Sequence, residues 1–195
     1  MPEFLTKINW VDIVCAAIFL RVIYVSRKTG IVIELSKLLI LIFSTFLSLH
    51  YFLTVSDLTR KQVNLEKSPL QFTDFIIFVL LLVFTYAVLS LFRSIIFNLI
   101  RPREQAKPTS LFSGLAGVAL SIVRGFLISS LIVFSLYISN ISYLTESSQK
   151  AHFSKKFFGM STGIYKGLWE NLASKFLSNE KVNSVVFEHE KEFYK

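Results

Sequence analysis

Long runs of apolar residues dominate the chain and predict helices that can cross a bilayer. Residues 38–55 and 75–92 each form an 18-residue stretch without a formal charge, taking His50 as neutral, and residues 125–145 form one of 21. A bilayer core about 30 Å thick takes roughly 20 apolar residues in a helix. A soluble domain of 195 residues can bury one such helix, but hardly three. The pattern therefore predicts an integral membrane protein.

The same pattern divides the chain into four transmembrane helices and a different kind of C-terminal segment. The spans are expected at about residues 8–25, 31–55, 72–100 and 111–141, and the first is the weakest by hydropathy. The fold class is therefore an all-α, polytopic membrane protein. We expect a four-span membrane domain over residues 1–145, followed by a polar linker and an amphipathic segment over residues 146–195.

The C-terminal segment has an amphipathic pattern, because apolar residues recur every four positions while charged residues occupy the other faces. The apolar positions are Ile164, Leu168, Trp169, Leu172 and Phe176. Such a helix can lie in the lipid headgroup region, which we favour, or pack on a partner or on the spans of its own chain. Three glycines before residue 168 weaken the first half, so the helix is expected only from about Ile164.

The fourth span, "SGLAGVALSIVRGFLIS" at 113–129, has a small residue at every fourth position. These residues are Ser113, Gly117, Ser121, Gly125 and Ser129. A stripe of this kind makes a shallow groove that lets another helix approach closely. It predicts tight helix packing against another span or against another subunit, so a homo-oligomer and a second membrane protein are both candidate partners.

Charged residues inside the spans are the other informative positions, because an ionisable group at the bilayer centre costs several kcal/mol unless it is paired or hydrated. They are Asp12, Glu34 and Arg124. Glu34 and Lys37 are three residues apart and can pair on one helical face. Arg124 lies at the interface if the fourth span begins near residue 118. Otherwise it is buried, and Glu34 or Asp12 is its expected partner.

Composition supports a lipid environment. Hydrophobic residues make up 53% of the chain and charged residues 17%, and the mean hydropathy is +0.57. The net charge of +8 would favour nucleic acid in a soluble domain. In a membrane protein, Lys and Arg gather at span ends and contact anionic lipid, as we expect of Arg93. The predicted partner is therefore the lipid bilayer and not nucleic acid.

Catalytic motifs are absent from the sequence. It has no HExxH or Cys/His metal pattern, no GxxxxGK[ST] phosphate loop and no GxSxG nucleophile elbow. The single cysteine, Cys15, is expected to be a packing residue. We therefore predict that the protein is not an enzyme and binds neither a metal nor a cofactor.

Three short motifs in order resemble the colicin V production protein (CvpA) family. They are "NWVD" at 9–12 opening the first span, Gly30 with Glu34 four residues later, and "RG" at 124–125 in the glycine-containing fourth span. The matching positions are Asn9, Trp10, Asp12, Gly30, Glu34, Gly114, Gly117, Arg124 and Gly125. The chain departs from the family at Thr29, where an arginine is usual.

The resemblance implies a multi-pass protein of the bacterial inner membrane with four spans, linked to colicin V or toxin export and to envelope function, and without an established enzymatic activity or cofactor. The expected function is a channel-like or accessory subunit that supports export or envelope homeostasis. The alternative is a membrane scaffold that transports nothing and recruits a partner through its C-terminal segment.

Overall fold

The computed structural model is all-helical over the residues that it describes, which are 9–27, 29–63, 70–100, 111–139, 141–177 and 180–194. The predicted all-α class is confirmed for this part of the chain. The elements are α1 (Trp10–Ser26), α2 (Ile31–Val63), α3 (Leu70–Ile100), α4 (Leu111–Ile138), α5 (Ser142–Lys150), α6 (His152–Leu168), the π-helical turn η2 (Trp169–Ala173), α7 (Ser174–Phe176) and α8 (Ser184–Phe193).

Three of these helices are long and apolar enough to cross a membrane. The candidate spans are Ile31–Gln62, Phe72–Asn98 and Ser113–Ile138, within α2, α3 and α4. α1, the predicted first span, has 17 residues. That length is at the lower end of what a bilayer-spanning helix needs.

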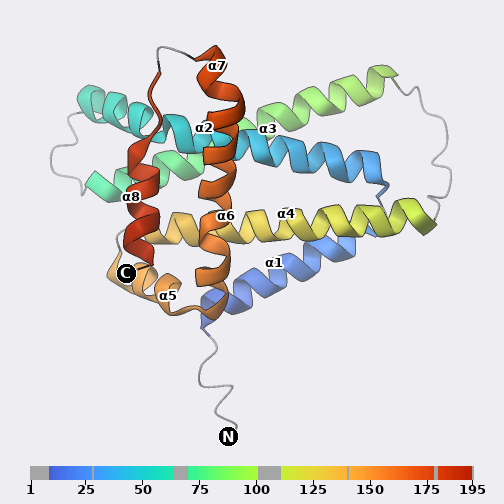
Figure 1. Ribbon diagram of the computed structural model, residues 1–195, viewed down its shortest axis with the longest axis horizontal. Helices are drawn as coiled ribbons and strands as arrows, with labels where there is room; N and C mark the ends of the chain where they lie inside the picture. Colours follow the sequence, from blue (N-terminus) through green and yellow to red (C-terminus); the bar gives the residue numbers. More distant parts are fainter. Residues whose placement is uncertain are drawn as a thin grey trace, which may run out of the picture.

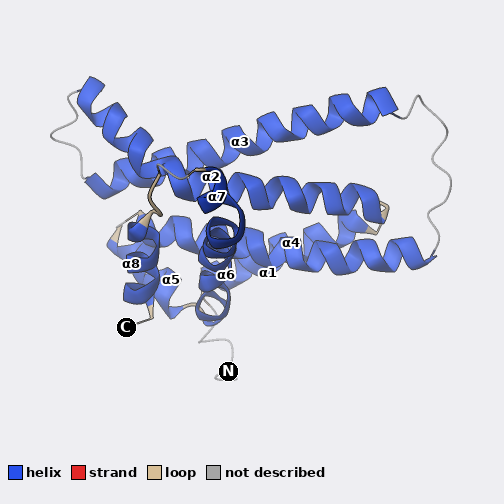
Figure 2. Ribbon diagram, turned by 45° about the horizontal axis from the view of Figure 1, so that its top comes forward, coloured by secondary structure: helices blue, strands red, loops and turns tan. Residues whose placement is uncertain are grey.

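The long helices run side by side, and the C-terminal helices lie across them (Figure 1). α2 packs on α3 and α4, α4 packs on α1 and α6, and α6 crosses both α2 and α4. α3 leans away from the others towards its C-terminal end (Figure 2), where most of its large apolar side chains are exposed. α5 and α8 flank α6 at the end of the bundle that holds the last residues of α4.

The hairpin between α2 and α3 differs from the sequence-based prediction. The second span was expected to end near residue 55 and the third to begin near residue 72, but α2 continues to Val63 and α3 already begins at Leu70. Asp74 accepts hydrogen bonds from Ser56 at 2.5 Å and from Arg60 at 2.7 Å. These contacts bind the polar end of α2 to α3, so the polar residues extend the helix rather than end it.

The C-terminal segment is also more helical than its glycines predict. The expectation of a helix only from Ile164 is wrong, because α6 begins at His152 and includes Gly159 and Gly163. Tertiary contacts outweigh the weak helix propensity of glycine here. The Ser130 hydroxyl of α4 accepts the Ser161 N–H at 3.0 Å and so fixes α6 on the bundle. Part of the predicted polar linker likewise forms α5.

An aromatic cluster holds α6 and α8 on α2, α3 and α4. Its fully buried members are Phe52, Phe78, Phe134, Phe158 and Tyr165. Phe158 stacks on Phe193 of α8 with 3.9 Å between ring centroids, and Phe134 meets Phe78 edge-on at 5.3 Å. Large rings from four helices therefore meet in one core.

Candidate functional site

The small-residue stripe of α4 faces α1 and the turn that leads into α2. A Cβ atom added to Gly125 would lie 2.6 Å from Cδ2 of Phe19, and one added to Gly117 would lie 3.0 Å from the Thr29 carbonyl oxygen. Distances this short leave no ordinary space for a side chain. The two glycines therefore allow the close approach of α4 to α1 that the stripe predicts.

Two serines of the stripe contact the same neighbours. The Ser121 and Ser26 hydroxyls lie 2.8 Å apart, and Ser129 is buried. Ser113 accepts the backbone N–H of Ile31 at 3.3 Å, where α2 begins. Four of the five members of the stripe thus meet α1, the α1–α2 turn or the start of α2 in their own chain.

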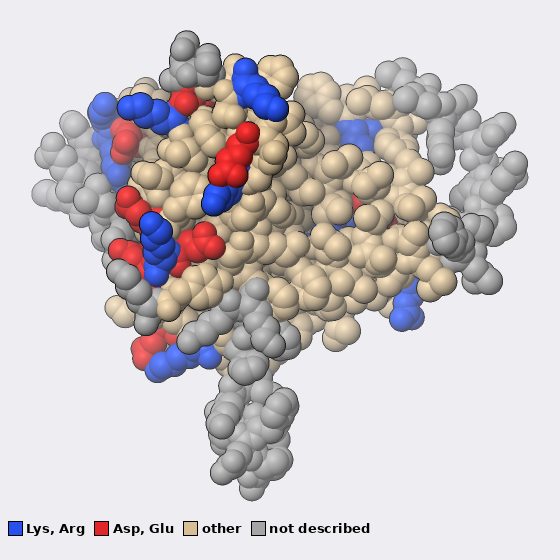
Figure 3. All heavy atoms as spheres, in the orientation of Figure 1, with Lys and Arg blue, Asp and Glu red and all other residues tan. Residues whose placement is uncertain are grey.

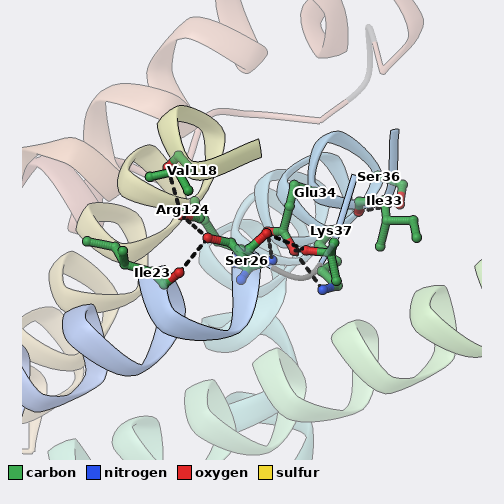
Figure 4. A network of polar contacts seen from close by, with 10 residues as sticks. Ile23, Ser26, Ile33, Glu34, Ser36, Lys37, Val118 and Arg124 are labelled. Atoms are coloured by element: carbon green, nitrogen blue, oxygen red, sulfur yellow. Dashed lines mark hydrogen bonds and ion pairs between the residues drawn. The ribbon is translucent and has the colours of Figure 1, made fainter. Parts of the chain in front are cut away.

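An ion pair is buried beside this contact. Nη1 of Arg124 on α4 lies 2.6 Å from Oε2 of Glu34 on α2, and the two side chains are 9% and 0% exposed. The other carboxylate oxygen of Glu34, Oε1, accepts from Lys37 Nζ at 2.7 Å and from the Thr29 hydroxyl at 2.5 Å. Figure 4 shows Glu34 between Arg124 and Lys37. Of the two sequence-based alternatives for Arg124, the structure places it in the interior.

The electrostatic balance of this cluster makes it sensitive to the loss of either partner. Two cations share one carboxylate, and among the described residues Oε2 of Glu34 has no partner with hydrogen-bond geometry, so its contact with Arg124 is an ion pair only. Burying two charges costs several kcal/mol each, which their attraction offsets only while both are present. Removing Glu34 therefore leaves Arg124 without its carboxylate in the interior, whereas removing Arg124 leaves Glu34 paired with Lys37.

Thr29 occupies the position where the family usually has arginine, and its hydroxyl binds Glu34 directly. Lys37, one turn into α2, supplies a cation to the same carboxylate. Gly30 accepts the Glu34 N–H at 3.2 Å in the first turn of α2, which fixes the start of the helix. Gly114, another matching position, has open space around its Cα.

The "NWVD" motif lies at the other end of α1 and joins it to α5. The Asn9 side chain caps α1 and donates to the Ser147 carbonyl at 2.5 Å, while Trp10 stacks on Tyr143. Asp12 is buried in the first turn of α1. It lies about 20 Å along α1 from the ion pair, at 1.5 Å per residue. Glu34, and not Asp12, is therefore beside Arg124.

A second polar cluster, which sequence analysis missed, lies where α6 crosses α2. The Tyr165 hydroxyl accepts the Asn183 N–H at 2.8 Å and lies 3.0 Å from Nδ1 of His50. His50 Nε2 lies 2.6 Å from Glu180. With the Tyr165 hydroxyl as donor to Nδ1, the neutral imidazole of His50 carries its proton on Nε2 and donates it to Glu180.

That hydrogen bond keeps the pKa of the Glu180 carboxyl below its ordinary value. No sequence pattern indicates that these residues are in contact, because His50 and Glu180 are 130 positions apart.

The five positions predicted to form an interfacial helix divide into two groups. Ile164, Leu168 and Trp169 pack partly buried against the core. Leu172 and Phe176, on η2 and α7, are 51% and 80% exposed. The segment therefore rests on its own spans and still presents two apolar side chains outward.

Neither polar cluster resembles a metal site. Within the part of the chain that the structure describes, no three His, Cys, Asp or Glu side chains converge to hold an ion. The chemistry available at the Glu34–Arg124 cluster is electrostatic: it can hold two helices together, orient water, or respond to a charged species.

Apolar helices of spanning length, a close contact lined with small residues and an ion pair buried between helices together define a helical, multi-pass membrane protein. The family model for the colicin V production protein matches residues 11–162. The chain belongs to this family. The ion pair, the α1–α4 contact and the first part of α6 all lie within the matched region. A search among curated proteins and another among solved structures each gave no match.

Proposed function

We propose that the protein is a bacterial inner-membrane protein of four transmembrane helices that supports colicin or toxin export or envelope homeostasis, as a channel-like or accessory subunit and not as an enzyme. The observation that carries this proposal is the Glu34–Arg124 pair, buried where α1, α2 and α4 meet. Charges inside membrane domains are costly, and those that occur usually serve transport or assembly.

The length of α1 supports its role as the fourth span. Its 17 residues extend about 26 Å at 1.5 Å per residue. Trp10 stands at its first residue and the exposed Tyr24 near its last, as in the aromatic belts of membrane proteins. α2 gives nearly the same thickness, because it runs about 24 Å from Ile31 to Phe46, where α6 crosses it.

α6 then marks one surface of the bilayer. It runs across the spans, and the charged side chains of the C-terminal helices gather on its side of the molecule, whereas the opposite part is largely apolar (Figures 1 and 3). An amphipathic helix lying along the membrane surface has this position. Leu172 and Phe176 would enter the headgroup region, and the ends of α2 and α4 would extend beyond it.

The test is to remove the charge pair in two steps. Arg124→Leu breaks the buried ion pair and leaves Lys37 as the ion-pair partner of Glu34, and it is expected to cost up to about 3–5 kcal/mol. The amount of folded protein in the membrane and the colicin V released by cells that lack their own family member should both fall. Glu34→Leu combined with Arg124→Leu removes both charges and should restore part of each.

Lys150→Leu is the matched control, because it breaks an exposed ion pair with Glu146 on α5 and should change neither quantity. If the double variant performs no better than Arg124→Leu, the two charges do not act as a pair. If colicin V release is unchanged when the protein is deleted, the proposed role in export is wrong, whereas the description of the ion pair is unaffected.

The scaffold alternative makes a different prediction for the C-terminal surface. Deleting residues 157–195 would also remove Phe158 and Tyr165 from the core and destabilise the fold. Point variants at exposed positions therefore test partner binding more specifically. Leu172→Glu with Phe176→Glu changes only exposed side chains. A scaffold that binds its partner there should lose it, whereas a channel-like subunit should keep most of its ion flux in liposomes.

A further inference from the structure

A polar hollow lies between α2 and α3, near the end of the bundle where the ion pair is buried. Its volume is about 200 Å³, and it is lined by Ile33, Ser36, Arg93, Ser94, Phe97 and Asn98. Ile33 is the third residue of α2, and Asn98 is two residues before the end of α3. The hollow is therefore within about two turns of one end of both helices.

The side chains in this hollow favour a negatively charged ligand. Its polar members are an arginine, two serines and an asparagine, and no lining residue is acidic. Nη1 of Arg93 is shielded from solvent and has no hydrogen-bond partner, nor does any carboxylate of the described residues pair with this arginine. The nearby Glu34 is occupied by Lys37 and Arg124. Arg93 is half-buried, and leaving its shielded Nη1 without an acceptor is costly, so an oxyanion that draws the guanidinium into the hollow would offset this cost.

The surroundings of the hollow indicate what kind of molecule carries that acceptor. Large apolar side chains flank it and are exposed, among them Val32 and Leu35 on α2 and Phe92, Ile95 and Ile96 on α3. A ligand that reaches Arg93 past these residues must itself be apolar over most of its length. Phosphate is the oxyanion that the planar, five-donor guanidinium binds best, often with two parallel hydrogen bonds.

We propose that this hollow binds the headgroup phosphate of a membrane phospholipid, with Arg93 as its charged contact and Ser94 and Asn98 as neutral donors. Basic pockets between transmembrane helices are suited to lipid headgroups. The acyl chains would lie along the exposed apolar face of α3. The sequence suggested that Arg93 reaches outward to the interface; in the structure Arg93 lines the hollow between two helices, and its Nη1 is shielded from solvent. This site rests on the proposed membrane placement but not on the export role.

The experiment uses purified, delipidated full-length protein in detergent and measures its melting temperature as dioleoyl phosphatidylglycerol is added. The wild-type protein should melt at a higher temperature as the lipid binds, because a ligand of the folded state stabilises it by mass action. Arg93→Gln should weaken the apparent lipid affinity roughly tenfold or more, since a charge-assisted hydrogen bond is lost. Arg93→Lys keeps the charge but loses the planar guanidinium with its parallel donors, so its apparent lipid affinity should lie between those of the wild type and Arg93→Gln.

Arg21→Gln is the matched control, because Arg21 is an exposed arginine on α1 and should respond to lipid like the wild type. Asn98→Leu fills the hollow without touching a charge, and it should weaken binding even if Arg93→Gln does not fold. Native mass spectrometry should show one retained phospholipid fewer in either variant.

Two further ligands identify the source of the phosphate. Dioleoylglycerol, which has the chains without phosphate, and inorganic phosphate, which has no chains, should each leave the melting temperature unchanged. Equal shifts for the wild type and both hollow variants, or a full shift with either of these ligands, would overturn the assignment. Colicin V release is not measured here, so failure of the lipid site and failure of the proposed export role are separate results.

Discussion

The two halves of the helix bundle are built in opposite ways. The ion-pair half comprises residues 11–44, 86–98 and 113–127, and it has a carboxylate and a guanidinium inside and apolar side chains outside. The aromatic half comprises residues 45–62, 72–85, 128–138 and 141–194. It has Phe158 and Tyr165 inside and carries the charged residues of the C-terminal helices on its surface (Figure 3).

This difference indicates the solvent of each half. An apolar exterior around a paired charge is expected in hydrocarbon, because exposing an apolar side chain such as leucine to lipid costs no free energy. A charged surface such as that of the C-terminal helices is expected in water, while α3 keeps exposed apolar side chains such as Leu80 and Phe84 in this half as well. The same three helices, α2, α3 and α4, pass through both halves, and α6 lies at the change from one to the other.

The largest expected effect is a contrast in cysteine labelling between the halves. Leu91 in the ion-pair half and Leu58 in the aromatic half are both helical leucines, 64% and 54% exposed. In a Cys15→Ala background, Leu58→Cys should react with a water-soluble maleimide at least about tenfold faster than Leu91→Cys in opened proteoliposomes. The thiolate is the reactive form, and apolar surroundings suppress it.

Denaturing detergent provides the control for this labelling, because both cysteines should then react alike. Equal rates in intact lipid would mean that the two halves share one environment, and the bilayer boundary at α6 would be wrong.

The next largest effect should be confined to the aromatic half. Phe158→Ala removes a fully buried ring that stacks on Phe193 and meets Tyr137 edge-on. Substitutions of this kind cost about 3–5 kcal/mol. Hydrogen exchange should show α6 and α8 losing protection while the amides around Glu34 keep theirs. Loss of protection in both halves would show instead that they unfold as one unit.

The sequence allowed more to be predicted about the ion-pair half than about the aromatic half. Its features are local in sequence: five small residues at a spacing of four, a charge within an apolar run, and a glutamate three residues before a lysine. The aromatic half depends on contacts between distant segments, such as His50 with Glu180 and Ser130 with Ser161. Twenty phenylalanines offer too many equivalent pairings for periodicity to select among them.

The start of α6 illustrates the same limit. Glycine has a low helix propensity, and that local signal favoured a later start for the helix. The buried ring of Phe158 and the hydrogen bonds of Ser130 come from tertiary packing, which no pattern within residues 152–168 reveals.

A smaller effect, within the ion-pair half, separates close packing from glycine content. Gly117→Val places a branched side chain against the Thr29 carbonyl, where even a Cβ would lie at 3.0 Å. Overpacking of this kind costs about 1–3 kcal/mol. Gly114→Val, three residues earlier on the same helix, meets open space and should leave thermal unfolding in detergent nearly unchanged. Equal losses would attribute the effect to the helix backbone rather than to the contact of α4 with the α1–α2 turn.

The smallest effect is a pH response in the aromatic half. Burial lowers the pKa of His189 on α8 below its ordinary value of 6.5, although Glu192, Asp74 and Glu188 partly oppose the shift. The unfolded segment therefore binds a proton more readily than the folded one. The stability that α8 gains from a neutral His189 is fully present above pH 6.5 and is lost as the pH falls below that value.

Hydrogen exchange of α8, corrected for the intrinsic pH dependence of exchange, should therefore show several-fold lower protection at pH 5.5 than at pH 8. The His189 ring meets Phe134 and Tyr137 edge-on, so His189→Phe keeps an aromatic ring in the same place without a titrating group. This variant should abolish the response in α8, while protection around Glu34 stays constant in both proteins. A response that persists in His189→Phe would assign the titration to another group, such as the cluster of His50 and Glu180. A response of equal size around Glu34 would mean that the ion-pair half is open to the same protons, against its placement in hydrocarbon.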